Sequence, residues 1–213
     1  MREFRIPKQP ISATKSVRFP VEMIDEVEEA IRGQDCTFSA FVVSAVRWAL
    51  DAGYRHIDTA AVYRNEASVG RAIEDSGIPR DQIWITTKLW NDEIRAENEE
   101  AAFAASLERL RTDYVDLYLV HWPVRENDGY LRVWEKMEKF NKEGRARSIG
   151  VSNFMPHHIE LLKAHCEILP MVNQLRLCPG VTQPEVVAYC KKNNILVEAY
   201  SPFGTGALFK VPQ

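Results

Sequence analysis

One repeated pattern dominates the sequence after residue 53: a short β-rich run, then a longer stretch whose apolar residues have helical spacing. The short runs that predict strands are Arg55–Thr59, Ile83–Thr87, Val115–His121, Ser148–Ser152, Met171–Gln174 and Ile195–Tyr200. The helices between them are expected to open near Asn65, Asn98, Tyr130, Pro156 and Gln183. Because nearly all of these strands are apolar and alternate with helices, the pattern predicts an α/β fold with a parallel sheet.

Side chains capable of chemistry lie where the expected strands end. Asp58 ends the first run with Tyr63 in the loop after it, Lys88 ends the second, and His121 ends the third. Parallel strands bring their C-terminal ends to one rim, so these side chains are expected to be neighbours. A phenol, with a reference pKa of about 10, gives up its proton more readily beside an ammonium group. The set suits protonation of an oxygen while hydride arrives at carbon.

Each of these residues also has a purely structural explanation. A histidine that ends a strand is more often a hydrogen-bonding residue than a catalyst, and an Asp–Lys pair is usually only an ion pair. Convergence of the four side chains on one rim is what favours the chemical interpretation.

Six motifs carry a resemblance to a known family. They are GYRHIDTAAVYRNEASVGRAI, TTKLWND, DYVDLYLVHWP, GVSNF, VNQ and AYSPFGTG, and over residues 45–208 they resemble the aldo-keto reductase family in order and spacing. The resemblance implies an incomplete (β/α)8 TIM barrel, strands two to seven, that reduces aldehydes or ketones with NADPH. It also implies that Tyr63 is the general acid, that Lys88 lowers its pKa, that Asp58 pairs with Lys88, and that His121 orients the substrate carbonyl.

The same resemblance supplies a cofactor site, although no GxGxxG fingerprint follows the first expected strand. It implies that Ser152, Asn153 and Gln174 bind the nicotinamide carboxamide and that Tyr200 stacks on the ring. The residues implied at the pyrophosphate are Ser201, Pro202, Phe203, Gly204 and Gly206, and the substrate-pocket walls implied are Trp90 and Trp122. Each of these aromatic residues can also be explained as a core residue.

Some strands of the family's barrel have no counterpart among the strands expected from this sequence. The usual first strand and the eighth strand are not seen, and the resemblance places the residues that grip the adenosine 2′-phosphate in the missing part. An unclosed parallel sheet exposes edge strands and apolar surface. We therefore expect weak or absent activity from this chain alone.

The first fifty residues follow a different pattern of strand, helix and helix. The segment SATKSVRFPVEMIDEVEEAIRGQDCTFSAFVVSAVRWAL resembles a ribbon-helix-helix module, with Thr37 or Ser39 as N-cap of its second helix. The resemblance implies a homodimer through residues 14–50 that binds DNA, with Thr14, Ser16 and Arg18 facing the bases. The alternative function is thus a DNA-binding protein that carries an inert barrel fragment.

The balance of charged residues in this segment argues in part against DNA binding. Residues 1–50 hold seven Lys or Arg and seven Asp or Glu, although basic residues predominate up to Arg18. Two domains are expected, a module of residues 1–50 and a partial barrel of residues 51–213. The net charge of −3 disfavours a general polyanion binder.

Composition narrows the class of protein. With 46% apolar and 27% charged residues and no apolar run of membrane-spanning length, we expect a soluble cytoplasmic protein without a membrane partner. The four cysteines have no metal-binding spacing, so no metal site is expected.

Overall fold

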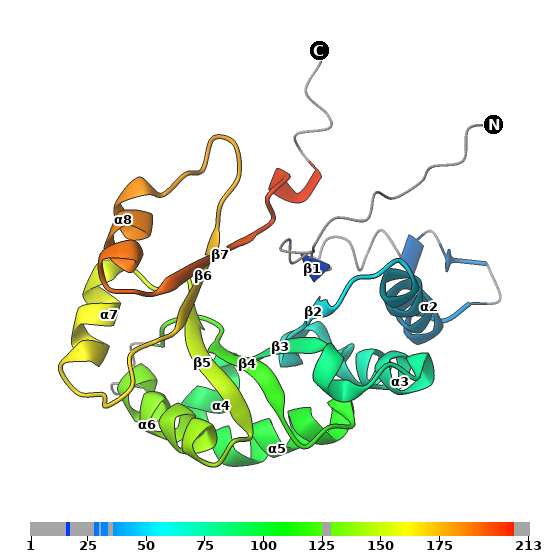
Figure 1. The fold of residues 1–213 in the computed structure, drawn as a ribbon, viewed down its shortest axis with the longest axis horizontal. Coiled ribbons are helices and arrows are strands. Elements are labelled where there is room, and N and C mark those ends of the chain that lie inside the picture. The colour runs from blue at the N-terminus through cyan, green and yellow to red at the C-terminus, as the bar shows by residue number, and fades with distance from the viewer. Residues whose placement is uncertain (1–15, 18–27, 30, 34–35, 125–128, 207–213) are drawn as a thin grey trace.

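The computed structural model describes residues 16–17, 28–29, 31–33, 36–124 and 129–206. Within these residues, seven parallel strands form one sheet in sequence order, from β1 to β7. Their bounds are β1 Ser16–Val17, β2 His56–Asp58, β3 Trp84–Leu89, β4 Val115–Val120, β5 Ala146–Ser152, β6 Val172–Arg176 and β7 Leu196–Tyr200. The sheet curls with β1 and β7 as its outermost strands (Figure 1). The expected fold class, an incomplete TIM barrel, is confirmed.

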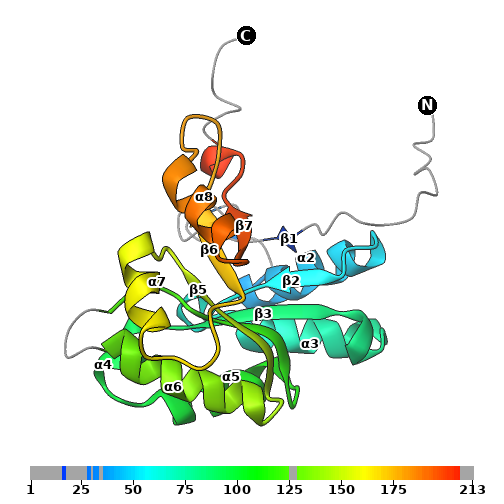
Figure 2. The same ribbon diagram turned by 60° about the vertical axis from the view of Figure 1, so that its left-hand side comes forward.

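Helices cover the outer, convex side of this sheet, as Figures 1 and 2 show. The α-helices are α2 Phe38–Asp51, α3 Glu66–Ser76, α4 Asn91–Arg95, α5 Glu99–Leu110, α6 Gly129–Lys142, α7 Pro156–Lys163 and α8 Pro184–Lys192, and two 3₁₀ turns are η1 Ala61–Tyr63 and η2 Arg80–Gln82. The expected strands and helices from residue 55 onward are confirmed to within about two residues at most ends. The short α4 was not expected from the sequence.

Alternation along each strand separates two hydrophobic layers. In β4, Tyr118 faces the helices and stacks on Phe103 of α5, with ring centroids 4.1 Å apart. Leu117 and Leu119 lie on the other face and form a small inner cluster with Val172. The large core therefore lies between sheet and helices, and the inner face is left for the polar residues described below.

Close packing of two outer helices requires a glycine. A Cβ added at Gly70 of α3 would lie 2.5 Å from the backbone oxygen of Arg109 in α5. Any side chain at this position would therefore push α3 and α5 apart.

The N-terminal region differs in part from the ribbon-helix-helix prediction. Ser16 and Val17 pair in parallel with His56 and Ile57, so this strand is part of the sheet. Thr14 and Arg18 lie outside the described residues, as does most of the first expected helix. The second expected helix is confirmed as α2, and the hydroxyl of Thr37 accepts a hydrogen bond from the Ala40 amide at 3.1 Å.

Helix α2 packs on the partial barrel. It buries Val42, Val46 and Leu50 in the same core as Ile57 of β2 and Val69 of α3. The domain boundary proposed near residue 50 falls at its last turn. In the part of the chain that the structure describes, no helix combines the length and the apolar character that a membrane crossing requires.

Candidate active site

A buried ion pair joins the ends of β2 and β3. The register pairs Asp58 with Thr86, which places Lys88 two residues farther along β3 on the same face. The Lys88 ammonium donates to Asp58 Oδ1 at 2.6 Å and to the backbone oxygen of Thr59 at 2.8 Å. Lys88 is 0% exposed, so it depends on these acceptors to stay charged.

Tyr63 and His121 lie beside this pair. The Lys88 ammonium is 5.5 Å from the centre of the Tyr63 ring, and the Tyr63 and His121 rings meet edge to face at 5.8 Å. Trp90 also packs against His121, with ring centroids 5.2 Å apart. The structure therefore brings together all four residues that the strand ends predicted, along with one of the two expected tryptophans.

The second expected tryptophan and the loop after β7 are more open. Trp122 directly follows His121 and is 43% exposed. In the loop of residues 201–206, Phe203 is exposed and Gly204 is buried. Ser201, Gly204 and Gly206 have left-handed backbone angles, so the chain turns sharply here.

Polar side chains at the ends of β5, β6 and β7 form a second, connected group. The Ser152 hydroxyl donates to the Gln174 backbone oxygen at 3.0 Å, and the Asn153 amide nitrogen donates to the Ser152 hydroxyl at 3.0 Å. The Tyr200 hydroxyl donates to Asn153 Oδ1 at 2.9 Å. The four residues that were expected to contact the nicotinamide, namely Ser152, Asn153, Gln174 and Tyr200, are therefore neighbours.

Two hydrogen bonds connect this group to the ion pair. The Gln174 side-chain amide donates to Asp58 Oδ2 at 2.7 Å, and the Asn153 amide donates to the His121 backbone oxygen at 3.3 Å. Asp58 thus has one carboxylate oxygen on Lys88 and the other on Gln174. The expected carboxamide contact of Gln174 is, in this structure, a contact with Asp58.

Sequence reasoning missed the residues that support the site by hydrogen bonding to the chain neighbours of Asp58 and Lys88. The Thr59 hydroxyl donates to the Asn65 side-chain oxygen at 2.7 Å, which fixes the segment whose carbonyl accepts from Lys88. Next to Lys88, the Thr87 hydroxyl donates to buried Glu66 at 2.5 Å, and Arg109 pairs with the same carboxylate at 2.7 Å. The only signal in the sequence was the YRNE segment, which holds Asn65 and Glu66 directly after Tyr63.

No cluster of three His, Cys, Asp or Glu side chains that could hold a metal ion occurs among the described residues. The chemistry of the site therefore has to be argued from its titratable groups, its amides and its aromatic rings.

Comparison with known proteins decides the family. The model of the aldo/keto reductase family matches residues 37–212. This chain belongs to the aldo/keto reductase family. It is 47% identical to a 9,11-endoperoxide prostaglandin H2 reductase of Trypanosoma cruzi, over 82% of this chain and 60% of that protein. It is 49% identical to a glyoxal reductase of Bacillus subtilis, over 77% of this chain and 59% of that protein.

Solved aldo-keto reductases have the same fold. The Bombyx mori aldo-keto reductase in complex with NADP is 42% identical and superposes with a TM-score of 0.72, over 81% of this chain and 61% of that one. The chain spans about three fifths of the length of the curated relatives it matches. The family model begins at the N-cap of α2, so α2 lies within the family match.

The buried ion pair generates a stability prediction. Asp58→Asn leaves the ammonium of Lys88 buried without its counter-charge, and we expect the free energy of unfolding to fall by about 3 kcal/mol. Urea denaturation measures this loss. The matched control is Glu74→Gln, which removes the carboxylate of the exposed Glu74–Arg111 pair and should cost less than about 1 kcal/mol. Equal losses in the two variants would contradict the assignment of Lys88 as a charged, buried group.

His56, on the same strand face as Asp58, generates a pH prediction. Burial lowers the pKa of His56 below 6.5, while nearby Asp58 opposes the shift. The unfolded chain therefore binds a proton at a higher pH than the folded chain does. The free energy of unfolding should be greatest above about pH 6.5 and should decline as the pH falls toward and through the lowered folded pKa.

Chemical denaturation of the wild type and of His56→Gln between about pH 8 and pH 5 tests this. The wild type should lose stability more steeply than the variant. His165→Gln, at an exposed position, is the control and should follow the wild type. A variant curve as steep as the wild-type curve would show that His56 is not the group responsible.

Proposed function

We propose that this chain is an NADPH-dependent oxidoreductase that reduces aldehydes or ketones to alcohols. The observation that carries the proposal is the buried Lys88 ammonium, held by Asp58 and by the Thr59 carbonyl, next to the ring of Tyr63. A neutral phenol beside a fixed cation is a stronger acid than a phenol in water.

In this proposal Tyr63 is the general acid. Its hydroxyl gives a proton to the carbonyl oxygen of the substrate as negative charge develops there. Lys88 stabilises the phenolate that is left behind, and Asp58 keeps the ammonium charged and in place. Tyr63 is buried, so its interaction with the ammonium is screened less than it would be in water.

His121 is proposed to orient the carbonyl. Its ring packs against those of Tyr63 and Trp90, and both contacts are edge to face. This packing fixes the plane of the imidazole, so a ring nitrogen can hydrogen-bond the same oxygen that Tyr63 protonates. Trp90 and the more exposed Trp122 are proposed as walls of the substrate pocket.

The connected polar side chains at the ends of β5, β6 and β7 are suited to bind a nicotinamide. A carboxamide needs both donors and acceptors, and Ser152, Asn153 and Gln174 provide them within a connected network. The Tyr200 ring, held through its hydroxyl by Asn153, is proposed to stack on the base. Ser201, Pro202, Phe203, Gly204 and Gly206 would line the pyrophosphate. The bound dinucleotide would supply the hydride.

Relatives support both the reaction class and the cofactor. Among them are a protein named glyoxal reductase and a structure described as a complex with NADP. The substrate class we propose is therefore aldehydes and ketones.

We further propose that turnover by this chain alone is slow. Among the described residues β1 and β7 are the outermost strands of the sheet and do not pair with each other, and Leu196 of β7 is 67% exposed. Water that enters an unclosed barrel weakens the electrostatic interactions on which the proton transfer depends.

DNA binding has less support. Ser16 and Val17 pair with β2 instead of forming a ribbon, and the other two expected base contacts, Thr14 and Arg18, lie outside the described residues. No observation of the described residues favours a dimer through residues 14–50.

Loss of absorbance by NADPH in the presence of a panel of aldehydes and ketones tests the proposal. The wild type should show slow but measurable turnover, and Tyr63→Phe should lower kcat by about 10²- to 10⁴-fold because it removes only the proton donor. The control is Tyr114→Phe, whose ring lies between Arg80 and Arg147 outside the site. Equal rates for wild type and Tyr63→Phe, or no turnover by the wild type, would contradict the proposal.

A further inference from the structure

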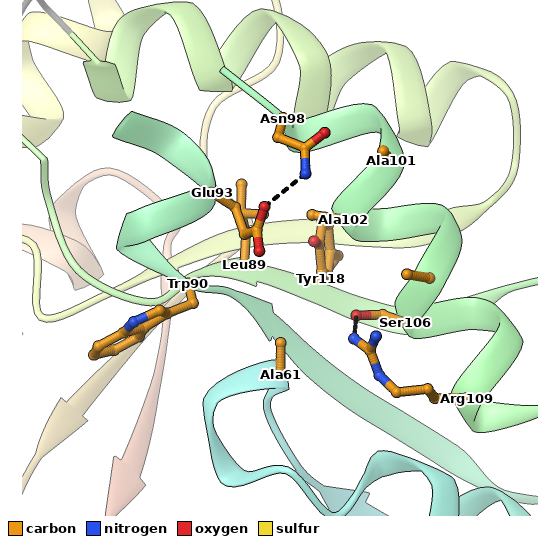
Figure 3. Close-up of a pocket in the computed structure, with 11 residues that line it drawn as sticks. Ala61, Leu89, Trp90, Glu93, Asn98, Ala101, Ala102, Ser106, Arg109 and Tyr118 are labelled. Atoms are coloured by element: carbon orange, nitrogen blue, oxygen red, sulfur yellow. Dashed lines mark hydrogen bonds between the residues drawn. The ribbon is translucent and has the colours of Figure 1, made fainter. Parts of the chain in front are cut away.

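A cavity of about 270 Å³ lies between strands β3 and β4 and helix α5 (Figure 3). Its floor is made by Leu89 of β3 and Tyr118 of β4, which face the helices because they alternate with the inward-facing residues of their strands. Asp58, Tyr63, Lys88 and His121 are not among its lining residues. Trp90, which packs on His121, also lines this cavity, so the cavity adjoins the proposed active site but contains none of its four proposed catalytic residues.

Small side chains create the space. The helix α5 turns Ala101, Ala102 and Ala105 toward the cavity, and Ala61 closes it from η1. A stripe of alanines alone would be only close-packing or a void, so the cavity has to be judged by what lies at its floor.

The floor carries a tyrosine. Tyr118 is 0% exposed, and its ring is fixed by Phe103 and Phe140, with centroids 4.1 and 6.2 Å away. Figure 3 shows Tyr118 reaching toward Ala102 at the centre of the lining residues. Within the described part of the chain the Tyr118 hydroxyl makes no hydrogen bond. The hydroxyl can donate one hydrogen bond, so a molecule in the cavity that accepts from it would be stabilised.

The protonation state of Tyr118 sets what it can bind. Burial raises the pKa of Tyr118 well above its usual value, and the carboxylate of Glu66 adds to the effect. The hydroxyl therefore stays protonated and offers a donor throughout the ordinary pH range.

Charges at the rim set the polarity of the ligand. The Arg109 guanidinium is balanced by Glu66, at 2.7 Å, and also donates to the Ser106 hydroxyl at 3.1 Å. Glu93, in contrast, accepts a hydrogen bond from the neutral amide of Asn98 at 2.8 Å. The rim therefore has a carboxylate whose charge the amide does not neutralise, and it disfavours an anion.

We propose that this cavity binds a small uncharged molecule, an apolar ring or short chain that carries a hydrogen-bond acceptor for the Tyr118 hydroxyl. A cavity of about 150 Å³ accommodates benzene, so this one has room for a substituted benzene. The apolar body would lie against Leu89 and the alanines of α5, and the acceptor would point at β4. Binding here does not depend on the proposed reductase activity.

Benzamide is a suitable probe because it is uncharged, carries a carbonyl acceptor and is not a substrate for carbonyl reduction. We would titrate it into the ¹⁵N-labelled full chain and follow the backbone amide signals of Ala101, Ala102 and Ala105. The expected result is a saturable shift of these signals. Benzoate, of the same shape but anionic, should bind at least about tenfold more weakly.

Two variants test the assignment. Tyr118→Phe removes only the hydroxyl and should weaken benzamide about fivefold, while leaving the binding of toluene, which has no acceptor, unchanged. Ala102→Leu fills the cavity and should abolish the shifts for both probes. Tyr114→Phe, a tyrosine outside the cavity, should bind benzamide like the wild type.

Three outcomes would overturn the proposal. The first is the absence of saturable shifts in the wild type, which would mean that the cavity holds only water. The second is binding of benzamide to Tyr118→Phe as tight as to the wild type. The third is tighter binding of benzoate than of benzamide.

Discussion

The structure depends on keeping a lysine charged inside the sheet. Lys88 has no exposed surface, so its ammonium must be matched by groups that the fold brings to it. Asp58, one strand away, supplies the charge, and the Thr59 carbonyl supplies a second acceptor. Gln174, two further strands beyond β4, occupies the other oxygen of Asp58. Three strands of the curled sheet, β2, β3 and β6, are thus fixed around one cation, and the aromatic and amide groups of the site are placed relative to it.

Much of this arrangement could be predicted from sequence, because the information is local. Parallel strands that alternate with helices place their C-terminal ends on one rim, so Asp58, Lys88 and His121 had to be neighbours once the strands were recognised. An N-cap at Thr37 or Ser39 could be predicted for the same reason, since capping depends on the adjacent backbone, and the structure has it at Thr37. Tyr63 followed from its position in the loop directly after β2.

Other features could not be predicted, because they depend on the curvature of the whole sheet. Residues Asp58 and Gln174 are 116 positions apart, and their contact exists only when β6 curls back toward β2. The pairing of Ser16–Val17 with β2 likewise depends on an edge that another strand can join. A local pattern of strand, helix and helix suggested a DNA-binding module there, but α2 buries its apolar face in the barrel core. From the sequence, Tyr118 could be predicted only to lie in a strand, and the structure shows that it also lines a cavity.

The most direct test of the central claim is the titration of the Tyr63 phenol, followed by NMR with ¹³C at the ζ carbon of tyrosine and assigned by loss of the signal in Tyr63→Phe. If the ammonium of Lys88 makes Tyr63 acidic, the wild-type signal titrates below the reference value of about 10. The account also predicts that this titration moves upward when the pair is made uncharged by Lys88→Met together with Asp58→Asn. A Tyr63 signal that titrates at or above the reference value, and that does not respond to the double substitution, would contradict it.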